Sequence, residues 1–73
     1  MMALTDTQRA TLDYITSHIT KHGFAPTIRE IGEACGGIKT NAVNDRLIAL
    51  ERKGYISRVI GKARTIRVLG TAA

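Results

Sequence analysis

The side chains of this chain that could do chemistry are mainly cations, and they are unevenly placed. Residues 1–37 carry three lysines and arginines against four acidic residues, whereas residues 38–73 carry eight against two. The net charge of +5 therefore comes from the second half. This asymmetry indicates an anionic partner, with nucleic acid as the first candidate. A solvated basic surface that keeps a small protein soluble would have the same composition.

Other reactive side chains form no site that the sequence identifies. His18 and His22 are four residues apart, but no further ligands follow at metal-site spacing. Cys35 shares a helix face with apolar residues, as a small buried side chain does. No nucleophile stands with a base, no loop is built to hold a phosphate and no carboxylates are paired for acid–base work. We expect neither an enzyme nor a metal site, cofactor or small-molecule substrate.

The totals place these residues on one small domain. A chain of 73 residues fits a single unit over 1–73, ordered over 3–69 and frayed over 70–73. One cysteine cannot form an internal disulfide, and no apolar run approaches the roughly 20 residues of a membrane span. The N-terminus has no signal-peptide pattern. We expect a cytoplasmic protein without a membrane partner.

Two helices are predicted in the first half. One begins at a capping box of Thr5 and Gln8 and ends at Gly23, and the next begins at a capping box of Thr27 and Glu30. Neither can bury its apolar stripe alone. The stripes expected to pack together, including that of a third helix, are Leu12–Ile15–Ile19, Ile28–Ile31–Cys35 and Val43–Leu47–Leu50.

The third helix should follow a tight glycine turn, with Thr40 as its cap and Gly54 at its end. Two short helices joined in this way are the helix-turn-helix arrangement. After Gly54 the apolar period changes from 3.6 to about 2 residues, which predicts strands over 55–60 and 65–69 joined by a loop over 61–64. The expected fold is α+β but mostly α: a winged helix-turn-helix, with three helices followed by a two-stranded β-hairpin wing.

The exposed face of the third helix is the first candidate surface. In a helix-turn-helix this helix lies in the major groove, with its N-terminal residues at the base edges. Asn41 could bond adenine through its amide, or it could be an ordinary helix-start residue. The helix start suits a phosphate. Arg46 is placed for a backbone phosphate or for solvent. The candidate residues are Lys39, Thr40, Asn41, Asn44, Asp45 and Arg46.

The predicted wing is the second candidate surface. Arg58, Lys62, Arg64 and Arg67 lie on it, and no acidic residue follows Glu51. Cations without counter-charges repel one another, which an anionic partner would offset. The alternative is that these charges guard an exposed strand edge against pairing with another chain. We favour a binding surface because a lysine also occupies the predicted loop.

A series of short matches runs collinearly from Ala3 to about Leu69: Ala3-Leu4-Thr5, Gln8, Pro26-Thr27, Glu30-Ile31, Asn41-Ala42, Ala49-Leu50, Arg52-Lys53-Gly54, Gly61, Arg64 and Ile66-Arg67. Through these residues the chain resembles the N-terminal DNA-binding domain of the LexA repressor family. The resemblance implies a winged helix, a third helix that reads the major groove, and transcriptional repression. It also assigns Asn41 and Ala42 to the base-contacting region.

The chain departs from that family at two places on the third helix. Lys39-Thr40 stand where the family has a Ser-Pro pair, and Asn44-Asp45 stand where it has two glutamates. The family's operator is therefore not implied. The family's C-terminal self-cleaving peptidase domain, which also dimerises its members, is expected to be absent.

Two functions fit these observations. The first is a small transcription regulator that binds double-stranded DNA through its third helix and basic wing. The alternative is a phage-encoded regulator that binds host RNA polymerase, inhibiting initiation or promoting antitermination, with the winged helix as a protein-binding surface. The altered third helix and the expected lack of a dimerising domain motivate the alternative, because one such module alone binds DNA weakly. Either would act in the cytoplasm of a bacterial cell or of a phage-infected host.

Overall fold

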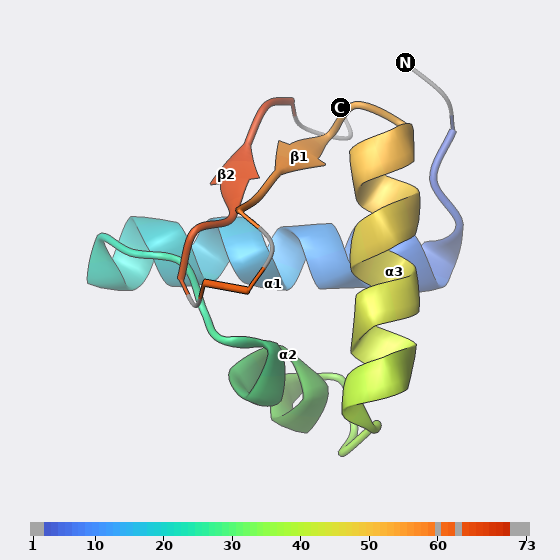
Figure 1. Cartoon of the computed structure of the whole chain (residues 1–73), viewed down its shortest axis with the longest axis horizontal. Coiled ribbons are helices and arrows are strands. Elements are labelled where there is room, and N and C mark those ends of the chain that lie inside the picture. Colours follow the sequence, from blue (N-terminus) through green and yellow to red (C-terminus); the bar gives the residue numbers. More distant parts are fainter. Residues whose placement is uncertain (1–2, 60, 63, 71–73) are drawn as a thin grey trace.

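The computed structural model describes residues 3–59, 61–62 and 64–70. Its elements are α1 (Asp6–His22), α2 (Ile28–Ala34), α3 (Thr40–Arg52), β1 (Ile56–Ser57) and β2 (Arg67–Val68). Figure 1 shows α3 crossing one end of α1, with α2 packed against both, β1 lying beside α3, and β2 on the other side of β1. The predicted winged helix-turn-helix, α+β but mostly α, is confirmed.

Both predicted capping boxes form. The Thr5 hydroxyl accepts the Gln8 N–H at 3.1 Å, and the Gln8 side chain accepts the Thr5 N–H at 3.1 Å. At the start of α2, the Thr27 hydroxyl accepts the Glu30 N–H at 3.1 Å and Glu30 accepts the Thr27 N–H at 2.8 Å. Each box satisfies two backbone donors that the first turn of a helix leaves free. Local sequence therefore sets where α1 and α2 begin.

The predicted start of α3 is wrong by one residue. The N-cap is Lys39, whose side chain makes no capping hydrogen bond, and Thr40 is the first helical residue. The turn before it is closed by the N–H groups of Gly37 and Ile38, which both donate to the Gly32 carbonyl at 2.9 and 3.1 Å. The Lys39 carbonyl then accepts the first helical bond, from the Val43 N–H at 3.1 Å.

The core lies between the three helices and the inner side of the hairpin. Its buried residues are Leu12, Ile15, Ala25, Ile31, Val43, Leu47, Leu50, Tyr55, Ile56 and Ile66. Six of them belong to the predicted stripes. The other stripe residues, Ile19, Ile28 and Cys35, are half-buried and pack against this cluster. Burial of these stripes fixes which faces of α3 and of the hairpin stay outside.

The strands are shorter than predicted. β1 and β2 pair antiparallel with Ile56 opposite Val68 and Ser57 opposite Arg67. Beyond this pairing, a side chain takes the place of backbone–backbone hydrogen bonds between the strands. The Thr65 hydroxyl accepts the Val59 N–H at 3.0 Å and lies 3.1 Å from the carbonyls of Val59 and Lys62. Ile60 and Ala63, expected in the first strand and the loop, lie outside the described residues. We call residues 56–68 the wing.

Gly70 was expected to begin the frayed tail, but its N–H donates to the Tyr55 carbonyl at 3.3 Å. Residues 71–73 are outside the described ranges. No helix within those ranges is long and apolar enough to span a bilayer.

Candidate nucleic-acid interface

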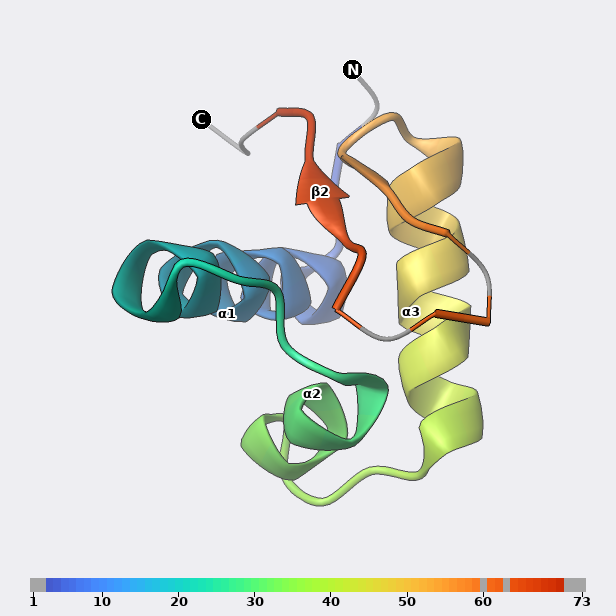
Figure 2. The same cartoon turned by 60° about the vertical axis from the view of Figure 1, so that its left-hand side comes forward.

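A groove of about 730 Å³ separates the wing from the helix-turn-helix. In Figure 2 the orange chain that follows α3 passes in front of this helix, and residues of both segments line the groove. One wall is formed by residues 26–29 and by α3, and the other by residues of the wing. Five predicted site residues are brought together along it: Thr40, Asn44, Arg58, Lys62 and Arg64.

The outer face of α3 is exposed as predicted. Asn41, Asp45 and Ile48 are exposed, while Asn44 and Ala42 are half-buried. Ile48, 41% exposed, is the large apolar side chain of this face. Polar side chains of this kind can form hydrogen bonds with base edges, and an apolar side chain beside them can contact the methyl group of thymine.

The start of α3 is open to solvent. Lys39 and Thr40 are exposed and line a smaller hollow of about 370 Å³ together with Ile28, Arg29 and Glu33 of α2. Because Lys39 makes no side-chain cap, the first-turn amides of α3 keep their capacity to bind an anion.

Two of the predicted cations lie on the side of α1, away from the groove. Arg46 is half-buried on the side of α1, where its guanidinium donates to the Thr11 hydroxyl at 3.3 Å. Arg67 lines a hollow together with Thr16 and Thr20 of α1. The helical period turns Arg46 away from Asn44, and the alternation of β2 turns Arg67 away from the buried Ile66. The structure therefore separates these two cations from the other site residues.

The expectation of a wing without counter-charges is wrong. Arg58 pairs with Glu51 of α3 at 2.6 Å, and its side chain is only 12% exposed. Arg64 pairs with Glu30 of α2 at 3.0 Å. The acidic partners lie earlier in the chain, so a count along the wing alone could not include them.

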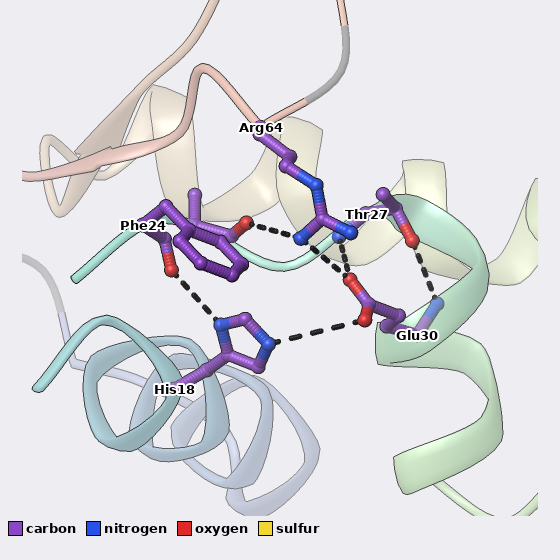
Figure 3. A network of polar contacts seen from close by, with 6 residues as sticks. His18, Phe24, Thr27, Glu30 and Arg64 are labelled. Carbon is purple, nitrogen blue, oxygen red and sulfur yellow. Dashed lines mark hydrogen bonds and ion pairs between the residues drawn. The ribbon is translucent and has the colours of Figure 1, made fainter. Parts of the chain in front are cut away.

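Arg64 is held by three groups at once (Figure 3). Besides the Glu30 carboxylate, its guanidinium donates to the Ala25 carbonyl at 3.1 Å and lies 4.8 Å from the centre of the Phe24 ring. His18 supports this cluster from α1. Its Nδ1 donates to the Phe24 carbonyl at 2.9 Å, and its Nε2 lies 4.0 Å from Glu30. The cluster ties the wing to α1 and α2.

This cluster also sets the ionisation of Glu30. The Thr27 backbone N–H, with the Arg64 guanidinium nearby, holds the pKa of the Glu30 carboxyl below its usual value.

Among the described residues, no group of three or more His, Cys, Asp or Glu side chains could hold a metal ion. His18 is instead part of the packing that fixes the wing.

The acidic residues that hold the wing in place, Glu30 and Glu51, were not predicted as its partners. Glu51 is seven residues before Arg58, and Glu30 is 34 before Arg64, so neither pair follows a local spacing rule. Glu30 was predicted only as part of a capping box. The one available signal was that a basic hairpin in a small fold needs neighbours that reduce its repulsion.

Comparisons with known proteins place this architecture in a family. A family model described as the LexA DNA binding domain matches residues 1–65. The chain is 56% identical over 66 residues to a LexA repressor of Anaeromyxobacter dehalogenans, covering 90% of this chain and 29% of that protein. It is 49% identical over 67 residues to a LexA repressor of Sorangium cellulosum, covering 92% and 29%. A LexA repressor of Mycobacterium tuberculosis is 46% identical over 68 residues, covering 93% and 29%.

The match is confined to one part of those proteins. The chain spans about 29% of the length of the curated relatives that it matches. Within this chain, however, the family model covers all three helices and most of the wing. The chain therefore belongs to the LexA DNA-binding domain family.

Proposed function

We propose that the chain is the double-stranded DNA-binding domain of a transcription regulator. The observation that carries the proposal is the groove between α3 and the wing, with Thr40, Asn44 and Ile48 of α3 on one side and three cations, Arg58, Lys62 and Arg64, among the residues on the other. A helix-turn-helix presents such a face to the major groove. Family membership supports the same partner.

Different residues would have different tasks in this complex. Asn41, exposed near the start of α3, is our candidate for contacting a base. Lys39 and Thr40, beside open helix-start amides, would bind a phosphate. Lys62 would bind another phosphate from the wing. Phosphate contacts position a protein on DNA and base contacts supply sequence preference, so the two groups should respond differently to mutation.

The polymerase-binding alternative has no specific observation in its favour. The relatives named above are repressors, and the groove offers the features that DNA binding requires. We therefore propose DNA as the partner, in the cytoplasm of the bacterial cell or infected host where that DNA lies.

An amide chemical-shift titration with a pool of random double-stranded DNA tests the proposal. We expect the shifts to be largest for the first two turns of α3 and for the wing, and small for the middle of α1. Affinity should fall steeply as salt rises from about 50 to about 200 mM, because bound phosphates release counterions. Absence of binding to any DNA at low salt would refute the proposal. Retention of RNA polymerase instead of DNA would favour the alternative.

A further inference from the structure

Arg58 holds two side chains of α3 from across the groove. Its Nε donates to the Glu51 carboxylate at 2.6 Å, and its Nη1 donates to the Asn44 Oδ1 at 3.2 Å. Asn44 and Glu51 are seven residues apart, which places them on one face of the helix. Since the Arg58 side chain is 12% exposed and that of Glu51 is 30% exposed, this arrangement is sheltered from solvent.

The guanidinium determines which way round the Asn44 amide is turned. An arginine has five N–H donors and no acceptor, so only the oxygen of an amide can face it. The amide nitrogen of Asn44, with two donors, must then lie on the opposite edge. Within the ranges that the structure describes, no group accepts a hydrogen bond from this nitrogen. Asn44 itself lines the groove.

This orientation limits which base Asn44 can bind. An asparagine that selects adenine uses both amide atoms, accepting from N6 and donating to N7. Arg58 takes up one of the two lone pairs of the Asn44 oxygen, whereas no described residue engages the two N–H donors of its nitrogen, so Asn44 is better suited to donate than to accept. Guanine presents two acceptors in the major groove, N7 and O6, and thymine presents O4. Adenine would place its N6 donors against an oxygen that already accepts from Arg58, which weakens the two-pronged contact.

Asn41 provides an internal contrast on the same helix. It lies three residues before Asn44 and is exposed, and in the described part of the chain its side chain has no hydrogen-bond partner. Both edges of its amide therefore stay available, as adenine requires. The two asparagines are chemically identical, and they differ in the presence of Arg58.

We propose that Arg58 is a positioning residue that turns the Asn44 amide and occupies part of its acceptor capacity, so that the base facing Asn44 is guanine or thymine in preference to adenine. The proposal rests on the proposed DNA-binding function and adds to it the base class at one position. Arg58 acts through Asn44 and need not touch DNA. Glu51 takes part indirectly, because its ion pair fixes the guanidinium that orients the amide.

The test is selection of binding sites from random double-stranded DNA at low salt, with the whole 73-residue chain and its variants. Asn44→Ala identifies the base pair that Asn44 contacts, because this variant should select all four bases equally at that position. At that position the unmodified chain should favour guanine or thymine over adenine by about fivefold or more. Arg58→Met, which keeps the apolar stem, should move that preference toward adenine by a similar factor. Arg58→Lys, which restores a donor to the Asn44 oxygen, should move it back.

The controls separate orientation from simple loss of structure or charge. Lys62→Ala should lower affinity for all sequences and leave the preference at this position unchanged. Circular dichroism and the backbone amide spectrum of Arg58→Met check that the fold is kept. If that variant unfolds, Glu51→Gln replaces it, since this change loosens Arg58 without removing it, and the same move toward adenine is expected.

Three results would overturn the proposal. The first is selection of adenine by the unmodified chain at the position whose base preference Asn44→Ala abolishes. That result would show that the Asn44 oxygen still accepts a hydrogen bond from the base. An unchanged preference in a folded Arg58→Met protein would show that Arg58 does not orient the amide. Failure of the unmodified chain to bind DNA would remove the proposed function itself, and the first two results can appear only when DNA is bound.

Discussion

Glu30 joins three parts of the molecule through one carboxylate. It caps α2 by accepting the Thr27 N–H at 2.8 Å, pairs with Arg64 of the wing at 3.0 Å and lies 4.0 Å from His18 of α1. The Thr27 backbone hydrogen bond and then the Arg64 charge lower the pKa of Glu30 from its ordinary value of 4.5. Its ionised form is therefore favoured by the folded state.

This shift predicts how acid affects stability. Because the folded pKa of Glu30 is below the unfolded value, its stabilising contribution is complete above about pH 4.5 and is lost as the pH falls through the lower folded pKa. Glu30→Gln should destabilise the protein near neutral pH, and the difference from the unmodified chain should shrink toward about pH 3. Urea unfolding at a series of pH values measures this difference.

Glu33→Gln is the matched control for that experiment. It removes an exposed carboxylate from the same helix, one whose ion-pair partner in the described part of the chain is the exposed Arg29, at 3.4 Å. Its effect on stability should be small, because such surface pairs contribute about 0–1 kcal/mol. A Glu30→Gln difference that is equal at neutral and acid pH would contradict the assignment.

Asn41 is the residue whose loss should affect sequence preference without affecting stability. It is exposed on the first turn of α3, so Asn41→Ala removes no buried contact. We expect the variant to lose about 1–3 kcal/mol of discrimination at one base pair and to keep most of its affinity for random DNA. Competition assays with DNA sites that differ at single positions measure this. Equal weakening at every site would show that Asn41 binds the backbone.

At the scale of elements, the angle between α2 and α3 depends on one glycine. Gly32 is buried within α2, and its carbonyl accepts both N–H groups that close the turn, from Gly37 and Ile38. A Cβ on Gly32 would lie 2.8 Å from the Ile38 carbonyl oxygen and 3.4 Å from the Val43 side chain. The first distance is too short for a carbon–oxygen contact, and its partner is backbone, which cannot move without changing the turn.

Gly32→Ala should therefore lower the free energy of unfolding by about 1–3 kcal/mol. Helix propensity acts in the opposite direction, since alanine is favoured over glycine by about 1 kcal/mol in a helix interior. Urea denaturation measures the net effect, and Ala10→Gly on the exposed side of α1 calibrates the propensity term. A stabilised Gly32→Ala protein would mean that the turn relaxes freely.

The elements differ in how well sequence alone predicts them. The starts of α1 and α2 depend on capping boxes within four residues, and both were predicted. The short strands could not be predicted, because their length depends on Thr65, whose hydroxyl takes the Val59 N–H that a longer ladder would have used. The N-cap of α3 is Lys39 and not Thr40, after a turn that the N–H groups of Gly37 and Ile38 close on the Gly32 carbonyl. Capping rules, which reach three residues along the chain, predicted the contacts within that range and failed where the partners lie five or six residues apart.

For the whole molecule, the same reason limits prediction of the candidate site. Periodicity correctly placed Asn41 and Asp45 on the outer face of α3, because burial of the apolar stripe leaves no other face for them. Charge counting found the basic hairpin but not its partners, Glu30 and Glu51, which come from other elements. It therefore overstated how many wing cations are available to a ligand.

These ion pairs distinguish the cations of the wing. Arg58 and Arg64 are already paired with carboxylates, and Arg67 lies over α1. Charge reversal at Arg64 would disturb the cluster with Glu30 as well as any phosphate contact. Lys62 is exposed and lines the groove, and among the described residues its side chain has no ion-pair partner. Lys62 is thus the residue with which to measure the electrostatic part of binding.

Lys62→Gln should weaken binding to all DNA sequences alike and make it less sensitive to salt. Each phosphate neutralised by a lysine contributes about 0.9 to the slope of log affinity against log salt concentration, so loss of one contact should reduce the slope by about that amount. Fluorescence anisotropy between about 50 and about 200 mM salt measures it. Lys21→Gln, which removes the same charge from the last turn of α1, controls for net charge. If both variants change the slope equally, the effect comes from overall charge, and Lys62 makes no phosphate contact from the wing.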